Sequence, residues 1–190
     1  MRIDKYIDKN NWDEIKDILP HITEIKSLNL GSMGLTEFPK MSHITIKGNF
    51  DISFNQLTSF KDCPVVNGDF YCNNNLITSF KDCPEIGGDF NCYDNQITSF
   101  KDCPQIKGYL HCTGNQIQSF KNCPNIGGYL YSDIIAFRII HKYSKEKKIS
   151  HLEAQVELYN QQNKELLEHI DKFPDLIAYI RMRELNKLLD

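Results

Sequence analysis

One pattern returns every 20 residues between Phe50 and Asp133. Its columns are Phe50, Phe70, Phe90, Leu110 and Leu130, then Asn55, Asn75, Asn95 and Asn115, then Phe60, Phe80, Phe100 and Phe120, and finally Pro64, Pro84, Pro104 and Pro124, each proline preceded by cysteine. A unit of this length is too small to bury its own apolar face, so it must stack on its neighbours. The period therefore predicts a solenoid, and any functional surface has to lie on stacked coils.

A single unit, residues 69 to 88, predicts one short strand followed by an irregular return. Phe70 and Cys72 alternate with polar or aromatic neighbours, as in a strand with one buried face. Asn75 follows where the chain leaves the strand, and asparagine tolerates left-handed geometry and bonds to nearby main chain. We expect the asparagine column to satisfy a stack of turns. Pro84 excludes a continuing helix in the return.

The unit core L/F-x-C-x-x-N-x-I resembles the L-x-L-x-x-N-x-L core of the leucine-rich repeat family over about residues 28 to 133. The likeness is strongest to short repeats with phenylalanine, cysteine and a C-P-x-x-x-G-G ending in some bacterial, bacteriophage and giant-virus proteins. The first unit departs from it, because Met33 replaces the asparagine and the next unit follows after 22 residues. The resemblance implies an α/β-type repeat solenoid with parallel strands on a concave face, irregular convex returns, and a role in binding other macromolecules, usually proteins.

The segments flanking the repeats predict caps, because a solenoid exposes apolar core at both ends. We expect an N-terminal helical cap over residues 1–26, the solenoid over 27–133 and an all-α segment over 134–190. In the first cap, Asn11 predicts a helix start and Pro20 a helix stop. Its predicted apolar face is Trp12, Ile15, Ile18 and Leu19.

The last segment begins with apolar residues that are expected to seal the final coil: Ile134, Ile135, Phe137, Ile139, Ile140 and Tyr143. A seam with alternating spacings of four and three follows: Leu152, Val156, Tyr159, Asn163, Leu166 and Ile170. Such a seam pairs two chains as a homodimer through residues 150–172, or packs within one chain. The intrachain cap is favoured, and Pro174 fits a first helical position.

Composition and charge limit the function classes. Apolar residues are 41% and charged residues 25% of the 190, as in an ordinary folded protein. No apolar run approaches the roughly 20 residues that a membrane span needs, and charges at the start argue against a signal peptide. We therefore expect a cytoplasmic protein, in the host cytoplasm if it is viral. Residues 1–133 carry 12 Lys and Arg against 16 Asp and Glu, so the repeats lack the basic stripe of a phosphate-binding surface.

Chemistry at a catalytic or metal centre is not indicated. The seven cysteines fall into two columns and are expected to be reduced, buried apolar side chains. C-x-x-C is absent, and no G-x-S-x-G, phosphate-binding glycine loop or H-E-x-x-H accompanies the histidines. We predict no enzyme activity, no cofactor, no metal and no small-molecule substrate.

The outward strand positions differ between units, whereas the returns are nearly invariant, so recognition is expected on the strands. None of them carries Lys or Arg, and aspartates lie among the aromatic residues. This acidic, tyrosine-rich face suits a basic surface on a partner protein. The candidate residues are Asp51, Phe54, Asp69, Tyr71, Asn73, Asp89, Asn91, Tyr93, Asp94, Tyr109, His111, Tyr129 and Tyr131.

The predicted function is a non-catalytic protein interaction module, and the viral likeness suggests a factor that binds and inhibits a host protein. The first alternative is a structural or assembly protein that self-associates through its C-terminal helices. The second is weak nucleic-acid binding through the basic run from Lys142 to Lys148.

Overall fold

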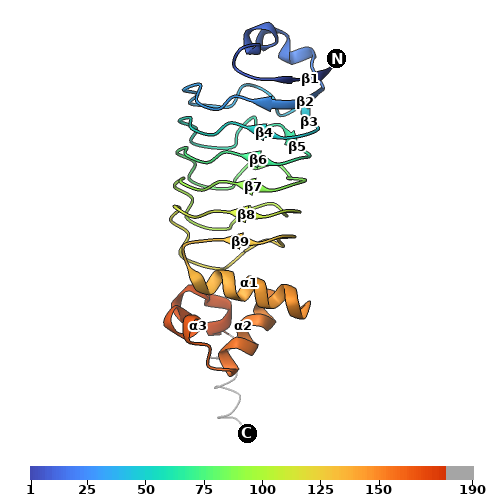
Figure 1. The fold of residues 1–190 in the computed structure, drawn as a ribbon. Coiled ribbons are helices and arrows are strands. Elements are labelled where there is room, and N and C mark those ends of the chain that lie inside the picture. The colour runs from blue at the N-terminus through green and yellow to red at the C-terminus, as the bar shows by residue number, and fades with distance from the viewer. Residues whose placement is uncertain (179–190) are drawn as a thin grey trace.

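The computed structural model describes residues 1–178, and the repeats form a stack of coils with a cap at each end (Figure 1). Nine parallel strands make one sheet in the order β5-β3-β2-β4-β6-β7-β8-β9, with β1 on β2. Each rung of the solenoid contributes a strand of only two residues after β2. The strands are β1 (Arg2–Ile7), β2 (Glu24–Asn29), β3 (Thr45–Ile46), β4 (Phe50–Asp51), β5 (Val65–Val66), β6 (Phe70–Tyr71), β7 (Phe90–Asn91), β8 (Leu110–His111) and β9 (Leu130–Tyr131).

The register of the sheet confirms the period of 20 residues. Phe70 pairs with both Phe50 and Phe90, and Leu110 continues the column to Leu130. The rings of Phe50, Phe70 and Phe90 stack with centroids 5.4 Å apart and are fully buried. Each such ring contributes about 1.5–3 kcal/mol through the apolar surface that it removes from water. Equivalent side chains thus form a continuous apolar interior.

The predicted irregular return contains a second parallel ladder, which the sequence pattern did not reveal. β3 pairs with β5, and single bridges continue from Val66 through Ile86 and Ile106 to Ile126. Between the two ladders runs a column of glycines, in which the Gly88 N–H donates to the Gly68 carbonyl at 3.0 Å. A Cβ at Gly88 would lie 2.8 Å from the Gly68 carbonyl carbon. Glycine is required there because successive backbones approach too closely for any side chain.

The invariant S-F-K-D-C-P segment of each return closes a tight turn. In one rung the Cys83 N–H donates to the Phe80 carbonyl at 2.9 Å, and Asp82 between them has φ of 63°. Aspartate and asparagine tolerate this left-handed geometry better than most residues. The column of Asp62, Asp82, Asp102 and Asn122, all with positive φ, therefore has a role in the backbone geometry of the returns.

The N-terminal cap is helical, as expected, but it does not form the single predicted helix that begins at Asn11 and ends at Pro20. It consists of β1, which adds a strand to the sheet, and two 3₁₀ turns, η1 (Trp12–Glu14) and η2 (Lys16–His21). Asn11 makes no side-chain capping bond, and Pro20 lies inside η2 instead of ending a helix.

The turns nevertheless cover the end of the core, since Trp12, Ile15 and Leu19 are buried. Ile18 is 36% exposed, because a 3₁₀ turn does not hold the 3.6-residue face on which its prediction depended. The predicted boundary at 26/27 also falls inside β2.

The C-terminal all-α segment is confirmed over the described residues, but its predicted seam is not one helix. It forms α1 (Ile135–Lys147), α2 (His151–Asn160), α3 (Lys164–Glu168) and η3 (Ile170–Lys172), and residues 174–178 are helical again from Pro174. The chain turns at Gln162, whose φ is 55°, and Asn163 caps α3 through a bond from the Leu166 N–H. The polar residue in the seam is therefore a helix cap, and the continuous coil that would support a homodimer through residues 150–172 is not formed.

α1 seals the last rung by replacing what a further rung would supply. His141 Nε2 donates to the Gly128 carbonyl at 2.8 Å. In the earlier rungs, the N–H of the next glycine in the column donates to the equivalent carbonyl. The ring of Phe137 lies 5.0 Å from Phe120, and Phe173 packs 5.5 Å from Phe137. The phenylalanine interior thus continues into the cap. No helix in residues 1–178 has both the length and the apolar character to cross a membrane.

Candidate recognition surface

The outward side chains of the strands and of the residues just after them form one surface, here called the strand face. Residues at equivalent positions of successive rungs form four columns on this surface. The second column is Asp51, Tyr71, Asn91, His111 and Tyr131, which pair in turn in the register of the sheet. The other columns have the same spacing: Asn49, Asp69, Asp89, Tyr109 and Tyr129 form the first, Ser53, Asn73, Tyr93, Thr113 and Asp133 the third, and Phe54, Asn74, Asp94 and Gly114 the fourth.

The first column has a structural role that the sequence comparison missed. Asn49 Oδ1 accepts the backbone N–H of Asp69 at 3.0 Å, Asp69 Oδ1 accepts that of Asp89 at 2.9 Å, and Asp89 Oδ1 accepts that of Tyr109 at 2.8 Å. Each carboxylate thus uses one oxygen to join consecutive rungs and keeps the other. Asp69 Oδ2 accepts from the Tyr71 hydroxyl at 3.2 Å. Burial, followed by the charge of Asp69, raises the pKa of Tyr71.

Aromatic side chains gather on the C-terminal rungs of the strand face. Tyr93 stacks on His111 with centroids 4.8 Å apart, and His111 lies 5.4 Å from Tyr131. Tyr109 contacts both Tyr129, at 5.8 Å, and Tyr131, at 6.4 Å. Tyr109, Tyr129 and Tyr131 are 45%, 62% and 41% exposed, although none of them is needed to fill the core. Five of the candidate residues, Tyr93, Tyr109, His111, Tyr129 and Tyr131, therefore form a contiguous aromatic patch, and Asp89, Asp94 and Asp133 lie on the same rungs as its rings.

Asn91, in the second column, has an unmet hydrogen-bonding group. Its Oδ1 is shielded from solvent and has no partner among the described residues. It lies in register between Tyr71 and His111. Burial lowers the pKa of His111, which keeps that ring neutral near pH 7. Asn91 and His111 are thus uncharged, and the Asn91 oxygen is an exception to the rule that buried polar atoms are hydrogen-bonded.

The fourth column is constrained by the backbone. Phe54, Asn74, Asp94 and Gly114 all have positive φ, between 51° and 66°. Asparagine, aspartate and glycine occupy this region readily, whereas a bulky residue there is strained. The residue types at these positions differ from one repeat to the next. At Asn74, Asp94 and Gly114 they are types that adopt positive φ readily. Phe54 alone goes against it, and it is 57% exposed.

The asparagine column does bond to neighbouring main chain. Asn75 Nδ2 donates to the carbonyls of Cys72 and Ile52, at 3.0 and 3.1 Å, and its Oδ1 accepts the Leu57 N–H at 3.0 Å. Asn95 repeats this arrangement one rung later, and Asn55 and Asn115 hold the ends of the column. The left-handed residue is the one before each asparagine, in the fourth column, and not the asparagine itself.

Asn73 is the one candidate that the structure removes from the surface. Its side chain is 5% exposed, and its Nδ2 donates to Asn74 Oδ1 at 3.0 Å. The chain begins to turn after the two-residue strand, so the alternation of outward and inward positions does not extend to residue 73. The other candidate positions are partly or fully exposed.

The cysteines are free thiols. Burial raises the pKa of Cys72 well above its usual value and that of Cys112 to about 12, so neither is a thiolate near neutral pH. Within residues 1–178, no three His, Cys, Asp or Glu side chains are grouped in a way that could hold a metal ion.

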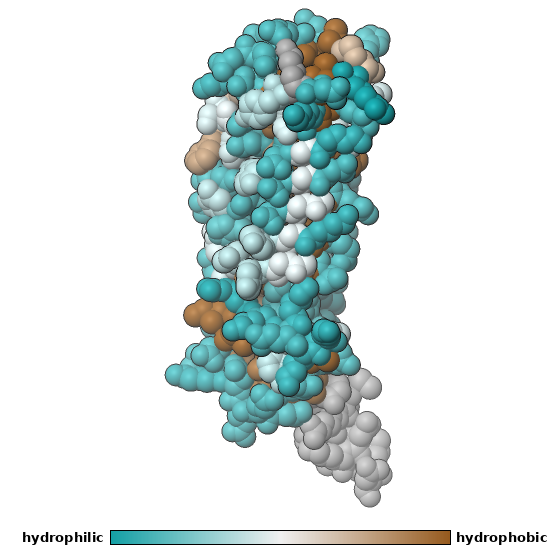
Figure 2. Space-filling model, turned by 45° about the vertical axis from the view of Figure 1, so that its right-hand side comes forward, coloured by the Kyte–Doolittle hydropathy of each residue, from teal (hydrophilic) through white to brown (hydrophobic). Residues whose placement is uncertain are grey.

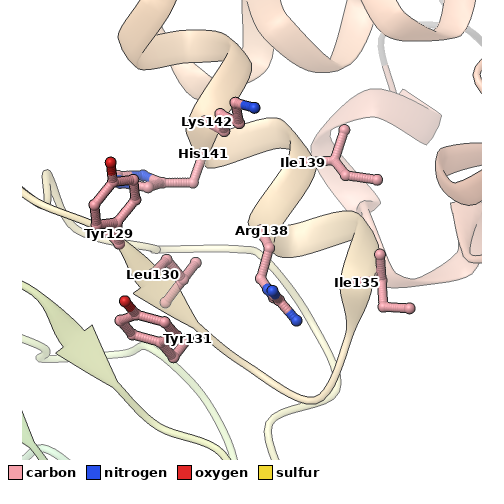
Figure 3. Close-up of a pocket in the computed structure, with 8 residues that line it drawn as sticks. All are labelled: Tyr129, Leu130, Tyr131, Ile135, Arg138, Ile139, His141 and Lys142. Carbon is pink, nitrogen blue, oxygen red and sulfur yellow. The ribbon is translucent and has the colours of Figure 1, made fainter.

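Sequence reasoning missed a hollow beside the aromatic patch, between β9 and α1. Figure 3 shows Tyr131 of β9 and Tyr129 just before this strand on one side, and Ile135, Arg138 and Ile139 of α1 on the other. Its volume is about 480 Å³. Ile135 was predicted to seal the last coil, but it is 54% exposed and borders this hollow. Only the packing of α1 against the last rung brings these residues together, so no local sequence pattern predicts the hollow.

Comparisons with known proteins found no match among family models, curated proteins or solved structures.

Proposed function

We propose that this chain is a non-catalytic protein-recognition module of the leucine-rich-repeat type that binds a partner protein through the strand face. The observation that carries the proposal is the exposed aromatic patch of Tyr93, Tyr109, His111, Tyr129 and Tyr131. These rings contact one another outside the core, and contiguous exposed aromatic surface is typical of interaction sites.

The charges of the strand face favour a partner with a basic surface. Asp51, Asp69 and Asp89 lie on successive rungs, and the columns contain no Lys or Arg. The second oxygen of Asp89 has no hydrogen-bond partner among the described residues, so it is available to a cation. Opposite charge would speed association and fix the orientation of the partner.

The likeness of the repeat to short repeats of bacteriophage and giant-virus proteins supports a narrower form of the proposal. In it, the protein acts in the cytoplasm of a host cell by occupying the surface of a host protein, for instance as an inhibitor. The asparagine ladder supports the assignment to the leucine-rich-repeat type, because it uses the asparagine of the shared core to join one rung to the next.

An affinity capture from cell lysate, followed by a binding measurement on the purified partner, tests the proposal. The face variant carries Tyr71→Ala, Tyr93→Ala and Tyr109→Ala. The matched control carries Lys61→Ala and Lys81→Ala, which change exposed residues on the returns. The expected result is a partner that the wild type and the control bind equally, that the face variant binds at least about tenfold more weakly, and whose affinity falls with salt. Equal binding by all three proteins would overturn the assignment of the strand face.

A further inference from the structure

The hollow between β9 and α1 is an apolar site that the fold leaves open. α1 turns Phe137 and Ile140 into the core and thereby seals the last rung. Ile135 and Ile139 are four residues apart and lie on another side of the helix, where they border the hollow. Ile139 also packs against the core, whereas Ile135 is 54% exposed and is not needed to seal the last rung.

Figure 2 shows hydrophobic atoms gathered at the junction of the solenoid and the helical cap, on a surface that is otherwise largely polar. The hollow is continuous with the strand face, because Tyr129 and Tyr131 line it and also contact Tyr109. A ligand that lies along the strand face therefore reaches the hollow without leaving the surface.

The charge of the hollow is opposite to that of the preceding rungs. Arg138 and Lys142 are its charged lining residues, and no carboxylate lines it. In Figure 3 the Arg138 guanidinium points into the space between Tyr131 and Ile135. Within residues 1–178 Arg138 has no hydrogen bond or ion pair, and Lys142 has only an exposed contact with Glu146 at 3.8 Å. Such an ion pair contributes little, so both cations are available to a ligand.

We propose that this hollow binds a short acidic segment of the partner protein, with an apolar side chain against Ile135 and a carboxylate on the Arg138 guanidinium. The planar guanidinium can receive a carboxylate through two parallel hydrogen bonds. The inference rests on the proposed function, and it adds the orientation of the partner along the stack. The basic surface of the partner lies over Asp51, Asp69 and Asp89, and its acidic, apolar segment lies at the end of the stack.

A nucleic acid would also meet cations and aromatic rings here, but the surroundings disfavour it. Asp133 lies on the same rung as Tyr129 and Tyr131, and Asp94 lies two rungs earlier, so a polyanion that tracked along the strand face would meet these carboxylates. A peptide can place its acidic residues only where Arg138 and Lys142 lie. The peptide is therefore the occupant that the charges favour.

Fluorescence anisotropy with two labelled peptides tests the site on the full-length protein. The acidic probe is acetyl-Gly-Glu-Leu-Phe-Glu-Gly, and the second probe has lysine in place of both glutamates. The acidic probe is expected to bind and the lysine probe to bind at least about tenfold more weakly. Arg138→Glu should weaken the acidic probe at least about tenfold and Arg138→Lys less, because lysine retains the charge but not the fork geometry. Ile135→Ser should also weaken it, without unfolding an already exposed position.

Lys101→Glu is the matched control, since it makes the same charge change on an exposed return and should leave binding unchanged. A dissociation constant weaker than about 1 mM for the acidic probe, or equal effects of Arg138→Glu and Lys101→Glu, would overturn the proposal. Displacement of the probe by a labelled thymidine decamer, with binding that falls steeply with salt, would also overturn it in favour of a nucleic acid.

The two proposals fail in different ways. A captured partner that is lost with the tyrosine variant but retained at full strength by Arg138→Glu would leave the strand face in place and remove the hollow. Capture that neither variant affects would remove the proposed function, whereas selective binding of the acidic probe would still show a peptide site between β9 and α1.

Discussion

Substitution of Asn75 by alanine tests the ladder that joins the rungs. Asn75 is 6% exposed, and its side chain bonds to four main-chain groups: the carbonyls of Ile52, Cys72 and, at 3.3 Å, Asn73, and the N–H of Leu57. These groups differ in the hydrogen-bond partners that they keep after Asn75→Ala. Ile52 O keeps a bond from Asn55, and Cys72 O keeps one from Asn95. The Leu57 N–H loses the only acceptor that the structure gives it.

The magnitude follows from this inventory. A buried donor without a partner costs about 1–3 kcal/mol, whereas each shared carbonyl loses one of two bonds worth about 0.5–1.5 kcal/mol each. We therefore expect Asn75→Ala to lower the free energy of unfolding by about 3 kcal/mol. This is a large part of the roughly 5–15 kcal/mol that stabilises a typical domain.

Urea denaturation followed by far-UV circular dichroism measures the loss, with Asn67→Ala as the control. Asn67 is exposed and its side chain has no bond among the described residues, so the control should change stability by less than about 0.5 kcal/mol. Hydrogen exchange adds a local measurement. The Leu57 amide should lose protection, while the Ile77 amide, held by Asn95, should keep most of it. A loss below about 1 kcal/mol, or a Leu57 amide that stays as protected as in the wild type, would refute the reasoning.

Two further substitutions test the strained and the titrating positions. Phe54→Asn should raise the free energy of unfolding by about 0.5–1 kcal/mol in the same assay, because φ of 55° suits asparagine, as at Asn74, and a side chain that is 57% exposed loses little burial. A lower stability would contradict this. His141 and His151 are bonded to each other at 3.2 Å, and burial lowers the pKa of both, that of His151 to about 4. As the pH falls, the two imidazoles bind protons at a higher pH in the unfolded chain than in the folded protein. The free energy of unfolding should therefore be at its full value above about pH 6.5 and should fall between pH 6.5 and 4. In thermal melts at different pH values, His151→Gln should show a weaker dependence on pH.

The solenoid could be predicted because the determinant of its fold is a repeated local pattern. Identical side chains at a fixed spacing can share an interior only if the units stack, and the pairing of Phe70 with Phe90 confirms that step. The ends of the chain lack this redundancy. Trp12 and Leu19 looked like one face of an α-helix, and 3₁₀ turns bury the same residues. The prediction of a continuous helical seam through Asn163 was wrong, because a single asparagine serves equally well as a helix cap.

The candidate surface was predictable only to the extent that strand alternation determines it. Alternation placed Tyr71, Tyr109 and Tyr131 outward correctly, because these residues lie in or next to the paired strands. It failed at Asn73, where the strand has already ended. The hollow at Arg138 depends on the way a helix packs against the last rung, which is a tertiary feature without a local signal.

The variation between repeats has more than one cause, which changes where a recognition signal should be sought. Asp69 and Asp89 join rungs, and Asn74, Asp94 and Gly114 suit a left-handed backbone, so their identities follow in part from the scaffold. The scaffold places no such demand on the rings. It does not require the exposed ring of Phe54, the tyrosines at 109, 129 and 131, or the unpaired oxygen of Asn91. Residues that the fold does not need, or keeps at a cost, are the first to test in the proposed recognition surface. They occur at both ends and at the centre of the strand face, so a partner that explains all of them must extend along most of the stack.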